Sequence, residues 1–270
     1  MTTIARHGAR SAAPVPFLPG AGNILRKELA EWLRTRRFAV TAALMTLLVG
    51  AVPVIAFLAN GGLEHGRLMA ARDLYDGMVG AWTGLSLTLG AFLIVALTMG
   101  TLIKEEEAGT AQWLFTKPVS RVGYCLAKWA ANSLAVIGAA VLIPSLVYFG
   151  LLQALFSGGV QHGAGALAAV GLTAFHATVE IALVLLLSAF FRSQAPVAGI
   201  AISLNLAPFV LFKVVTLKLL GFTPVLIGYV ATTAARGQHV GPWQPVVCAA
   251  VMLPLCVAGA CLRLRAKQLQ

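Results

Sequence analysis

Long apolar runs alternate with short polar segments along most of the chain. The runs cover residues 38–58, 79–103, 129–152, 163–191, 197–212 and 246–262. A helix rises about 1.5 Å per residue, so the first run would be about 31 Å long, which is enough to cross the hydrocarbon core of a bilayer. We therefore predict an all-α integral membrane protein with six transmembrane helices between residues 38 and 262.

An amphipathic segment, residues 23–37, precedes the first run. Its sequence NILRKELAEWLRTRR places apolar side chains near helical spacing and basic side chains over the remaining surface. Asn23 is a residue type that caps helix N-termini, so we expect a helix that starts after it. We interpret this helix as an elbow that lies along the membrane surface; the alternative is a solvated basic lead-in to the first span. Residues 1–22, rich in Ala, Pro, Gly and Arg, are expected to form a disordered tail.

The composition supports a membrane protein and argues against a nucleic-acid-binding one. Hydrophobic residues make up 59% of the 270 residues, and the mean hydropathy is +0.86, well above a soluble domain. The net charge of +11 does not form a basic stripe interleaved with aromatic residues, so we expect no nucleic-acid partner. The four cysteines lack CxxC spacing and neighbouring histidines, which indicates neither a disulfide framework nor a zinc site.

The distribution of basic residues predicts the orientation in the membrane. With six spans, fifteen lysines and arginines fall on the side of the two termini and five on the opposite side. The positive-inside rule then places both termini, including the tail 263–270, in the cytoplasm. Residues 219–235 are apolar enough to compete as a seventh span, but that would export the basic tail. We prefer an outer region, residues 213–240, with re-entrant or surface-lying short helices broken at Gly221 and Pro224.

A charged island, residues 104–128, separates the second and third apolar runs and should lie in the cytoplasm. Glutamates stand where the second run ends, a Gly-Thr pair permits a turn, and residues 111–115 form a predicted short helix with three large apolar side chains. Pro118 should end that helix and Ser120 should cap the third span. A short helix held between two spans by tight turns is suited to transmitting motion.

The order of these features resembles a known family. The amphipathic segment RKELAEWLRTRRF, the first two spans and the motif E-x-x-x-GT-x-x-x-L-x-x-x-PVSR-x-x-x-x-x-AK resemble the permease subunit of ABC-2 type transporters, including the nitrous-oxide-reductase maturation permeases and drug and lipid exporters. The matching motif residues are Glu105, Gly109, Thr110, Pro118, Ser120, Arg121 and Lys128. The resemblance implies a type V exporter-like transmembrane domain in a prokaryotic inner membrane, with a pair of short outer helices between spans five and six.

The resemblance also implies a role for the charged island. In that family the loop between spans two and three is a coupling helix that docks into a cleft of the ATP-binding subunit. The residues expected to couple to the ATPase are Glu105, Glu106, Glu107, Gly109, Thr110, Trp113, Leu114, Phe115, Pro118, Ser120 and Arg121. We expect Glu105 or Glu107 to pair with the elbow arginines Arg34, Arg36 and Arg37. The alternative is that the glutamates only brace two membrane-surface elements, and both interpretations can hold at once.

The chain contains no ATP-binding loop of the Walker A type. Such a loop needs Gly-Lys followed by Ser or Thr, and no lysine here precedes either residue. We therefore expect no enzymatic activity and no cofactor in this chain, with ATP and magnesium on a separate ATPase subunit. By resemblance the expected partners are two ATP-binding subunits, a second copy of this chain or a related permease, and membrane lipid.

Polar residues inside the predicted spans are few. His176 and Glu180 are four residues apart and share one face of the fourth span, and a carboxylate there should face the bundle interior or a wet cavity. They are candidates for lining a transport pathway, as is Asn205; the alternatives are a mutually hydrogen-bonded His–Glu pair that fixes packing, and an Asn205 that satisfies backbone groups freed by Pro208. No third ligand accompanies the pair, so we assign no metal. A stand-alone carrier or membrane enzyme using His176 and Glu180 remains the alternative function.

Overall fold

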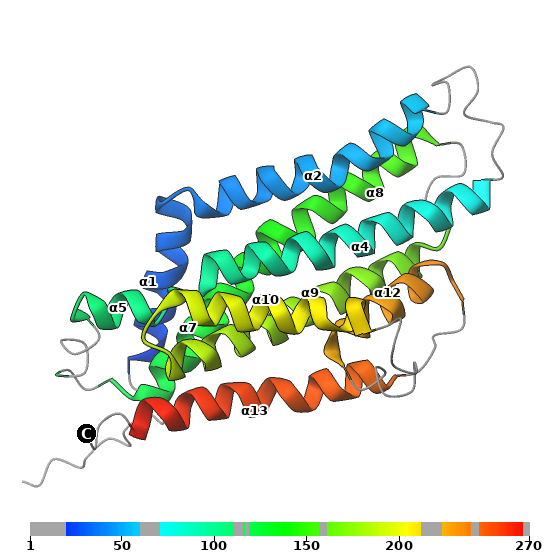
Figure 1. The fold of residues 1–270 in the computed structure, drawn as a ribbon. Helices are drawn as coiled ribbons and strands as arrows, with labels where there is room; N and C mark the ends of the chain where they lie inside the picture. The colour runs from blue at the N-terminus through cyan, green and yellow to red at the C-terminus, as the bar shows by residue number, and fades with distance from the viewer. Residues whose placement is uncertain are drawn as a thin grey trace, which may run out of the picture.

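The computed structural model describes residues 20–59, 71–110, 116, 119–156, 161–211, 223–238 and 243–266. All regular elements in these ranges are helical (Figure 1). They are α1 (Ala21–Arg34), α2 (Arg37–Ala59), α4 (Ala71–Thr98), α5 (Ile103–Glu107), α7 (Arg121–Val136), the π-helical η1 (Ile137–Leu142), α8 (Ile143–Leu155), α9 (Gly163–Phe190), α10 (Gln194–Leu211), the 3₁₀ turn η2 (Pro224–Leu226), α12 (Ile227–Ala235) and α13 (Gln244–Ala266).

The long helices lie side by side in one bundle (Figure 1). Five helical segments within the described ranges are long and apolar enough to cross a membrane: Arg37–Ala59, Tyr75–Glu107, Arg121–Leu155, Gly163–Phe190 and Gln244–Ala266. The chain is thus a multi-pass membrane protein. α1 runs across the end of the bundle where α5 and the last turn of α13 also lie, so the first and last described helices share that end (Figure 1).

The expected fifth span, residues 197–212, corresponds to α10. This helix packs against α4 and α9 (Figure 1). Its described apolar stretch, Gln194–Ala207, is shorter than the five segments that are long enough to cross a membrane. Residues 212–222 lie outside the described ranges, so the crossing of the membrane by α10, the total of six spans and the sidedness of the chain stay predictions. The third span begins at Arg121 and not at residue 129, because Ser120 caps a helix that continues into the membrane without a break.

The long helix from Arg121 to Leu155 accommodates a proline without ending. Pro144 lacks a backbone N–H and cannot donate to the preceding turn. The six residues before Ile143 form the wider π-turn η1, which shifts the backbone bonding pattern ahead of the proline. Gly138 lies in this turn and leaves room for the Phe38 ring of α2. A Cβ atom added at residue 138 would lie 3.1 Å from the nearest atom of that ring.

An aromatic group forms the main core between α2, α4 and α8. Trp82 is completely buried, with its ring centre 5.2 Å from that of Phe149 and 6.5 Å from that of Tyr148. The Tyr148 hydroxyl donates a 2.7 Å hydrogen bond to the Met78 carbonyl. Pairs of this kind add about 0.5–1.5 kcal/mol beyond the apolar area that they bury.

The short helix α12 is fixed against α4 and α9 at the end of the bundle opposite α1 (Figure 1). It follows a turn that begins at Pro224, as expected for a helix broken at that residue. The Tyr75 hydroxyl donates to the Ala235 carbonyl at 2.9 Å, and Arg236 donates to the Asp76 carbonyl at 2.8 Å. Gly221 and the rest of the first part of the outer region lie outside the described residues.

Glycines permit this close contact, which leads to a first prediction. A Cβ at Gly165 of α9 would collide with the Ala234 carbonyl oxygen, a backbone atom that cannot rotate away. We expect Gly165→Ala to lower the free energy of unfolding by about 1–3 kcal/mol, because α12 must shift from α9. Thermal unfolding of the purified protein measures this change. The control is Gly171→Ala on the same helix, where an added Cβ meets nothing within 4 Å; equal stability of the two variants would contradict the close contact.

Candidate functional site

Helix α1 begins at Ala21, so the expected start after Asn23 is wrong. The residue before the helix is Gly20, which has a left-handed backbone (φ 79°). A Cβ there would lie 2.9 Å from a methyl group of Val119, so glycine permits both the turn and the contact with the end of the charged island. The helix then buries Ile24, Glu28 and Trp32, which are four residues apart and share one face, against α7.

The charged island begins where the chain turns from α4 into α5. Residues 99–102 form this turn, and the Met99 carbonyl accepts a 3.1 Å hydrogen bond from the Ser188 hydroxyl of α9. Leu102 and Ile103 are buried, with 1% exposure each. The start of α5 is therefore anchored in the bundle, while Glu105 reaches toward α1 and α7.

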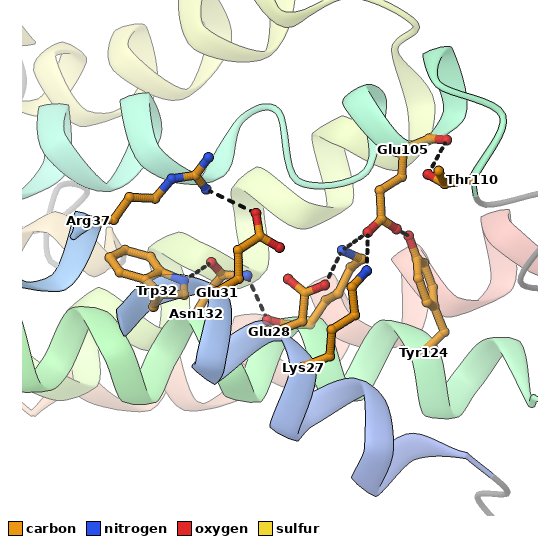
Figure 2. A network of polar contacts seen from close by, with 10 residues as sticks. Lys27, Glu28, Glu31, Trp32, Arg37, Glu105, Thr110, Tyr124 and Asn132 are labelled. Atoms are coloured by element: carbon orange, nitrogen blue, oxygen red, sulfur yellow. Dashed lines mark hydrogen bonds and ion pairs between the residues drawn. The ribbon is translucent and has the colours of Figure 1, made fainter. Parts of the chain in front are cut away.

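Lys128 connects three helices at this end of the protein. It lies two turns inside α7, and its side chain is only 2% exposed. Its ammonium group lies 2.9 Å from Glu28 Oε1 on α1 and 3.1 Å from Glu105 Oε1 on α5 (Figure 2). A buried ammonium without partners would destabilise the fold by several kcal/mol, so the two carboxylates are required together. We call Glu28, Glu105 and Lys128 the Lys128 clamp.

Further contacts complete the hydrogen bonding of Glu105. The Tyr124 hydroxyl donates to Glu105 Oε2 at 2.5 Å, and Lys27 Nζ lies 3.6 Å from Oε1 (Figure 2). The Thr110 hydroxyl donates to the Glu105 carbonyl at 3.1 Å, which holds the residue after the left-handed Gly109 close to α5. The carboxylates of Glu28 and Glu105 are balanced by Lys27 and Lys128, so the group is neutral.

A second contact between α1 and α7 lies one turn further along both helices. The Trp32 indole N–H donates to Asn132 Oδ1 at 3.1 Å, and the Asn132 amide donates to the Lys128 carbonyl at 2.8 Å (Figure 2). Since Trp32 follows Glu28 by four residues and Asn132 follows Lys128 by four, two matched contacts fix the register of α1 on α7.

The expected pairing of Glu105 or Glu107 with the elbow arginines is wrong for Glu105. Its cationic partners are lysines, and Arg37 lies 4.0 Å from Glu31 within the elbow. Arg34, Arg36 and Arg37 occupy the turn between α1 and α2 and are exposed, whereas Lys27 and Glu28 lie on the part of α1 that faces α5. Glu107 is exposed as well.

The sequence interpretation missed Lys27, Glu28 and Tyr124, and treated Lys128 only as a motif position. One signal was available: Glu28 belongs to the same apolar helix face as Ile24 and Trp32, which marks a carboxylate that needs a buried partner.

Other residues of the charged island have clear positions. Ser120 caps α7 by accepting a 2.8 Å hydrogen bond from the Gly123 amide, as the sequence predicts. Arg121 donates to the Leu264 carbonyl near the end of α13 at 2.7 Å. Glu106 is half-buried. Trp113, Leu114, Phe115 and Pro118 lie outside the described residues, so their contact with an ATPase stays a prediction.

The three candidate pathway residues come together in the bundle. His176 and Glu180 lie on α9 and Asn205 on α10. The Asn205 amide donates to Glu180 Oε1 at 2.8 Å and to the Ala201 carbonyl at 3.0 Å. His176 Nε2 lies 3.9 Å from Glu180 Oε2, too far for a hydrogen bond. The alternative of a hydrogen-bonded His–Glu pair is therefore wrong, and Asn205 is the hydrogen-bonding partner of the carboxylate. Within the described ranges, no three His, Cys, Asp or Glu residues are grouped to hold a metal ion.

The apolar helices and the charged end define a multi-pass membrane protein. The family model for ABC-2 family transporter proteins matches residues 22–236. The chain therefore belongs to the ABC-2 transporter permeases. A search of curated proteins finds no significant match to the sequence.

The Lys128 clamp yields a stability prediction. We expect Lys128→Met to lower the free energy of unfolding by roughly 3–5 kcal/mol, because it leaves two partly buried carboxylates without their cation. Thermal or denaturant unfolding of the purified protein measures the loss. The triple variant Lys128→Met, Glu28→Gln and Glu105→Gln should recover most of it, because the only charge of the group that remains is that of the exposed Lys27.

The matched control is Lys27→Gln, whose side chain is 66% exposed. That change should cost no more than about 1 kcal/mol. An equal loss of unfolding free energy in Lys128→Met and Lys27→Gln would show that the buried ion pairs of the clamp stabilise the fold no more than an exposed one.

Proposed function

We propose that this chain is the membrane permease subunit of an ATP-driven exporter. It works with a separate ATPase, which binds the charged island, and with a second copy of itself or a related permease. The observation that carries the proposal is the Lys128 clamp, because it joins the start of the island to two other helices at a single buried ammonium group. Membership of the ABC-2 family supports it.

The clamp supplies a route for force from the island into the membrane. A push on residues after Glu107 reaches α5, whose Glu105 contacts both α1 and α7 through Lys27 and Lys128. From Lys128 the rigid helix continues to Leu155 at the opposite end of the bundle (Figure 1). Movement at the island would therefore be passed on by packed elements and not by a loose loop.

Space beside the clamp is compatible with such movement. A polar pocket of about 100 Å³ opens between α1, the turn 99–102 and α7, and its lining includes Lys104, Glu31 and Asn132. Water in this pocket can solvate charges that separate when α5 shifts.

The ATPase is assigned to another polypeptide because this sequence has no Gly-Lys-Ser or Gly-Lys-Thr. The excess of basic residues at the α1 and α5 end favours a cytoplasmic location for the clamp, where an ATPase can reach it. Export, six spans and location in a prokaryotic inner membrane follow from the family resemblance. His176, Glu180 and Asn205 then become pathway-lining residues.

Docking can be tested without knowledge of the cargo. We expect the tagged chain, purified from its native cells, to carry with it a protein containing a Walker A sequence, identified by mass spectrometry. Leu114→Asp should abolish this association, because a charge would enter an apolar cleft, whereas the control Leu114→Met should retain it. Association of the ATPase with the Leu114→Asp chain would disprove docking through this segment, and transport by the chain alone would favour a carrier.

Coupling can be tested separately from docking. In Glu105→Gln the ATPase should still bind, but nucleotide-driven movement should reach the far end of the bundle weakly. A spin label at Tyr229, an exposed residue of α12, reports the distance between the two copies with and without trapped nucleotide. We expect the nucleotide-dependent shift to fall below about half of its original size. The control Arg265→Gln, at an exposed position near the end of α13, should keep the full shift, and a full shift in Glu105→Gln would rule out transmission through the clamp.

A further inference from the structure

Two cysteine side chains meet between α7 and α13. Cys125 of α7 is completely buried, Cys261 of α13 is 8% exposed, and their thiols are hydrogen-bonded to each other. All four cysteines of the chain are free thiols in the structure. The pair lies in a buried cluster that is separate from the aromatic core around Trp82.

The contact between the two thiols follows from the way α7 and α13 pack. The helices run in opposite directions, with the first turn of α7 beside the last turn of α13 (Figure 1). There the Arg121 guanidinium donates a hydrogen bond to the Leu264 carbonyl at 2.7 Å. Cys125 follows Arg121 by four residues and Cys261 precedes Leu264 by three, so both steps lead one turn deeper into the bundle. The hydrogen bond at the helix ends and the thiol contact therefore belong to one register.

The surroundings of the pair limit its chemistry. Apolar side chains of α1 and α9, among them Ile24, Ala182 and Leu185, enclose the two thiols. A structural zinc site needs four ligands, and no three His, Cys, Asp or Glu residues are grouped in the part of the chain that the structure describes. Two thiols that already touch can reach the sulfur–sulfur bond length of about 2 Å through small adjustments. Oxidation to a disulfide is therefore the reaction for which this pair is arranged.

The two cysteines differ in their access to an oxidant. Cys125 is enclosed on all sides, whereas Cys261 keeps some exposure and lies one turn before the exposed residues Arg265 and Ala266 at the end of α13. Exposure favours oxidation of a thiol. A small uncharged oxidant would therefore react first with Cys261, and Cys125 would serve as the second thiol.

We propose that Cys125 and Cys261 are a redox pair, which a peroxide converts into a disulfide that ties α7 to α13. In the first step the Cys261 thiol is oxidised to a sulfenic acid, the O–O bond of hydrogen peroxide breaks and one water leaves. In the second step the Cys125 sulfur attacks the sulfenic sulfur, the sulfur–sulfur bond forms and a second water leaves. The two thiols lose two electrons and two protons in total, and the peroxide gains them.

The disulfide would act on the helix that carries the clamp lysine. Cys125 precedes Lys128 by three residues on α7, so the bond would hold this part of α7 against α13. Under the predicted orientation this end faces the cytoplasm, where thiols are kept reduced and disulfides are transient. The bond would form under oxidative load and be reversed by thiol–disulfide exchange. As a cross-link the pair stands on geometry alone; as a restraint on coupling it rests on the proposed function.

The cross-link can be tested on the purified full chain in lipid nanodiscs. The chain is treated with hydrogen peroxide, unfolded with N-ethylmaleimide present and digested with trypsin. Cleavage after Arg121 and Lys128 yields the peptide 122–128, whose one cysteine is Cys125. We expect this peptide to be joined to the peptide 237–263, which contains Cys261. The undigested chain should keep the mass of one copy and carry two fewer maleimide groups, and dithiothreitol should restore full labelling.

Alanine variants identify the second cysteine, because the peptide 237–263 also contains Cys248 and Cys256. Cys125→Ala and Cys261→Ala should each abolish the cross-link. The matched control is Cys256→Ala, which changes another buried cysteine of the same cluster and should retain it. Cys261→Ala decides the question if Cys125→Ala does not fold, because the two changes remove opposite ends of one bond.

The restraint on coupling is measured on the complex with the ATPase. A spin label at Tyr229, introduced as a non-natural amino acid so that no cysteine is added, reports the nucleotide-dependent distance between the two copies. Peroxide should reduce this shift to less than about half of its size, because α7 can no longer move relative to α13. Dithiothreitol should restore the shift, and Cys261→Ala should keep it in peroxide.

Three outcomes would overturn parts of the proposal. Labelling of all four cysteines after peroxide treatment would disprove the redox pair, as would a cross-link to residues 122–128 that persists in Cys261→Ala. A full nucleotide-dependent shift in the cross-linked chain would disprove the restraint on coupling. The cross-link assay contains no ATPase, so failure to find a co-purifying Walker A protein would count against the proposed function and not against the thiol pair.

Discussion

The buried ammonium of Lys128 is the interaction on which the charged end of this protein depends. An ammonium group inside a helix bundle must be met by carboxylates, and here they come from two elements that are distant in sequence, α1 and α5. The requirement decides where α1 lies across the bundle and how α5 leaves α4. Tyr124, Lys27 and the Trp32–Asn132 hydrogen bond extend this contact into a network (Figure 2).

The rest of the bundle follows a different principle. Its helices are held by apolar packing, by aromatic contacts around Trp82 and by glycines that allow close approach, as where α12 meets α9 at Gly165. Among the described residues, buried acidic or basic side chains occur at two places. One is the Lys128 clamp at the α1 end, and the other is the Glu180 position within the membrane. Under the proposed function, the first transmits movement from the ATPase into the bundle.

Hydropathy along the sequence predicts most of the membrane helices. The α9 span was predicted at 163–191 and observed as Gly163–Phe190, because long uncharged runs have few alternatives to helices in a membrane. Capping by Ser120 and the break at Pro224 also followed from local chemistry. The start of α1 was less accessible from the sequence, because it depends on the contact between Gly20 and Val119, which are far apart along the chain.

The sequence by itself determined that this is an all-helical membrane chain with one charged island and a few intramembrane polar residues, because composition and periodicity are local properties. It also placed His176, Glu180 and Asn205 among the candidates. Only the tertiary structure decided which charges meet: Glu105 contacts lysines and not the elbow arginines, and Glu180 is bonded to Asn205 and not to His176. Pairing of charges depends on distances across helices, and neither residue type nor spacing along one helix specifies those distances.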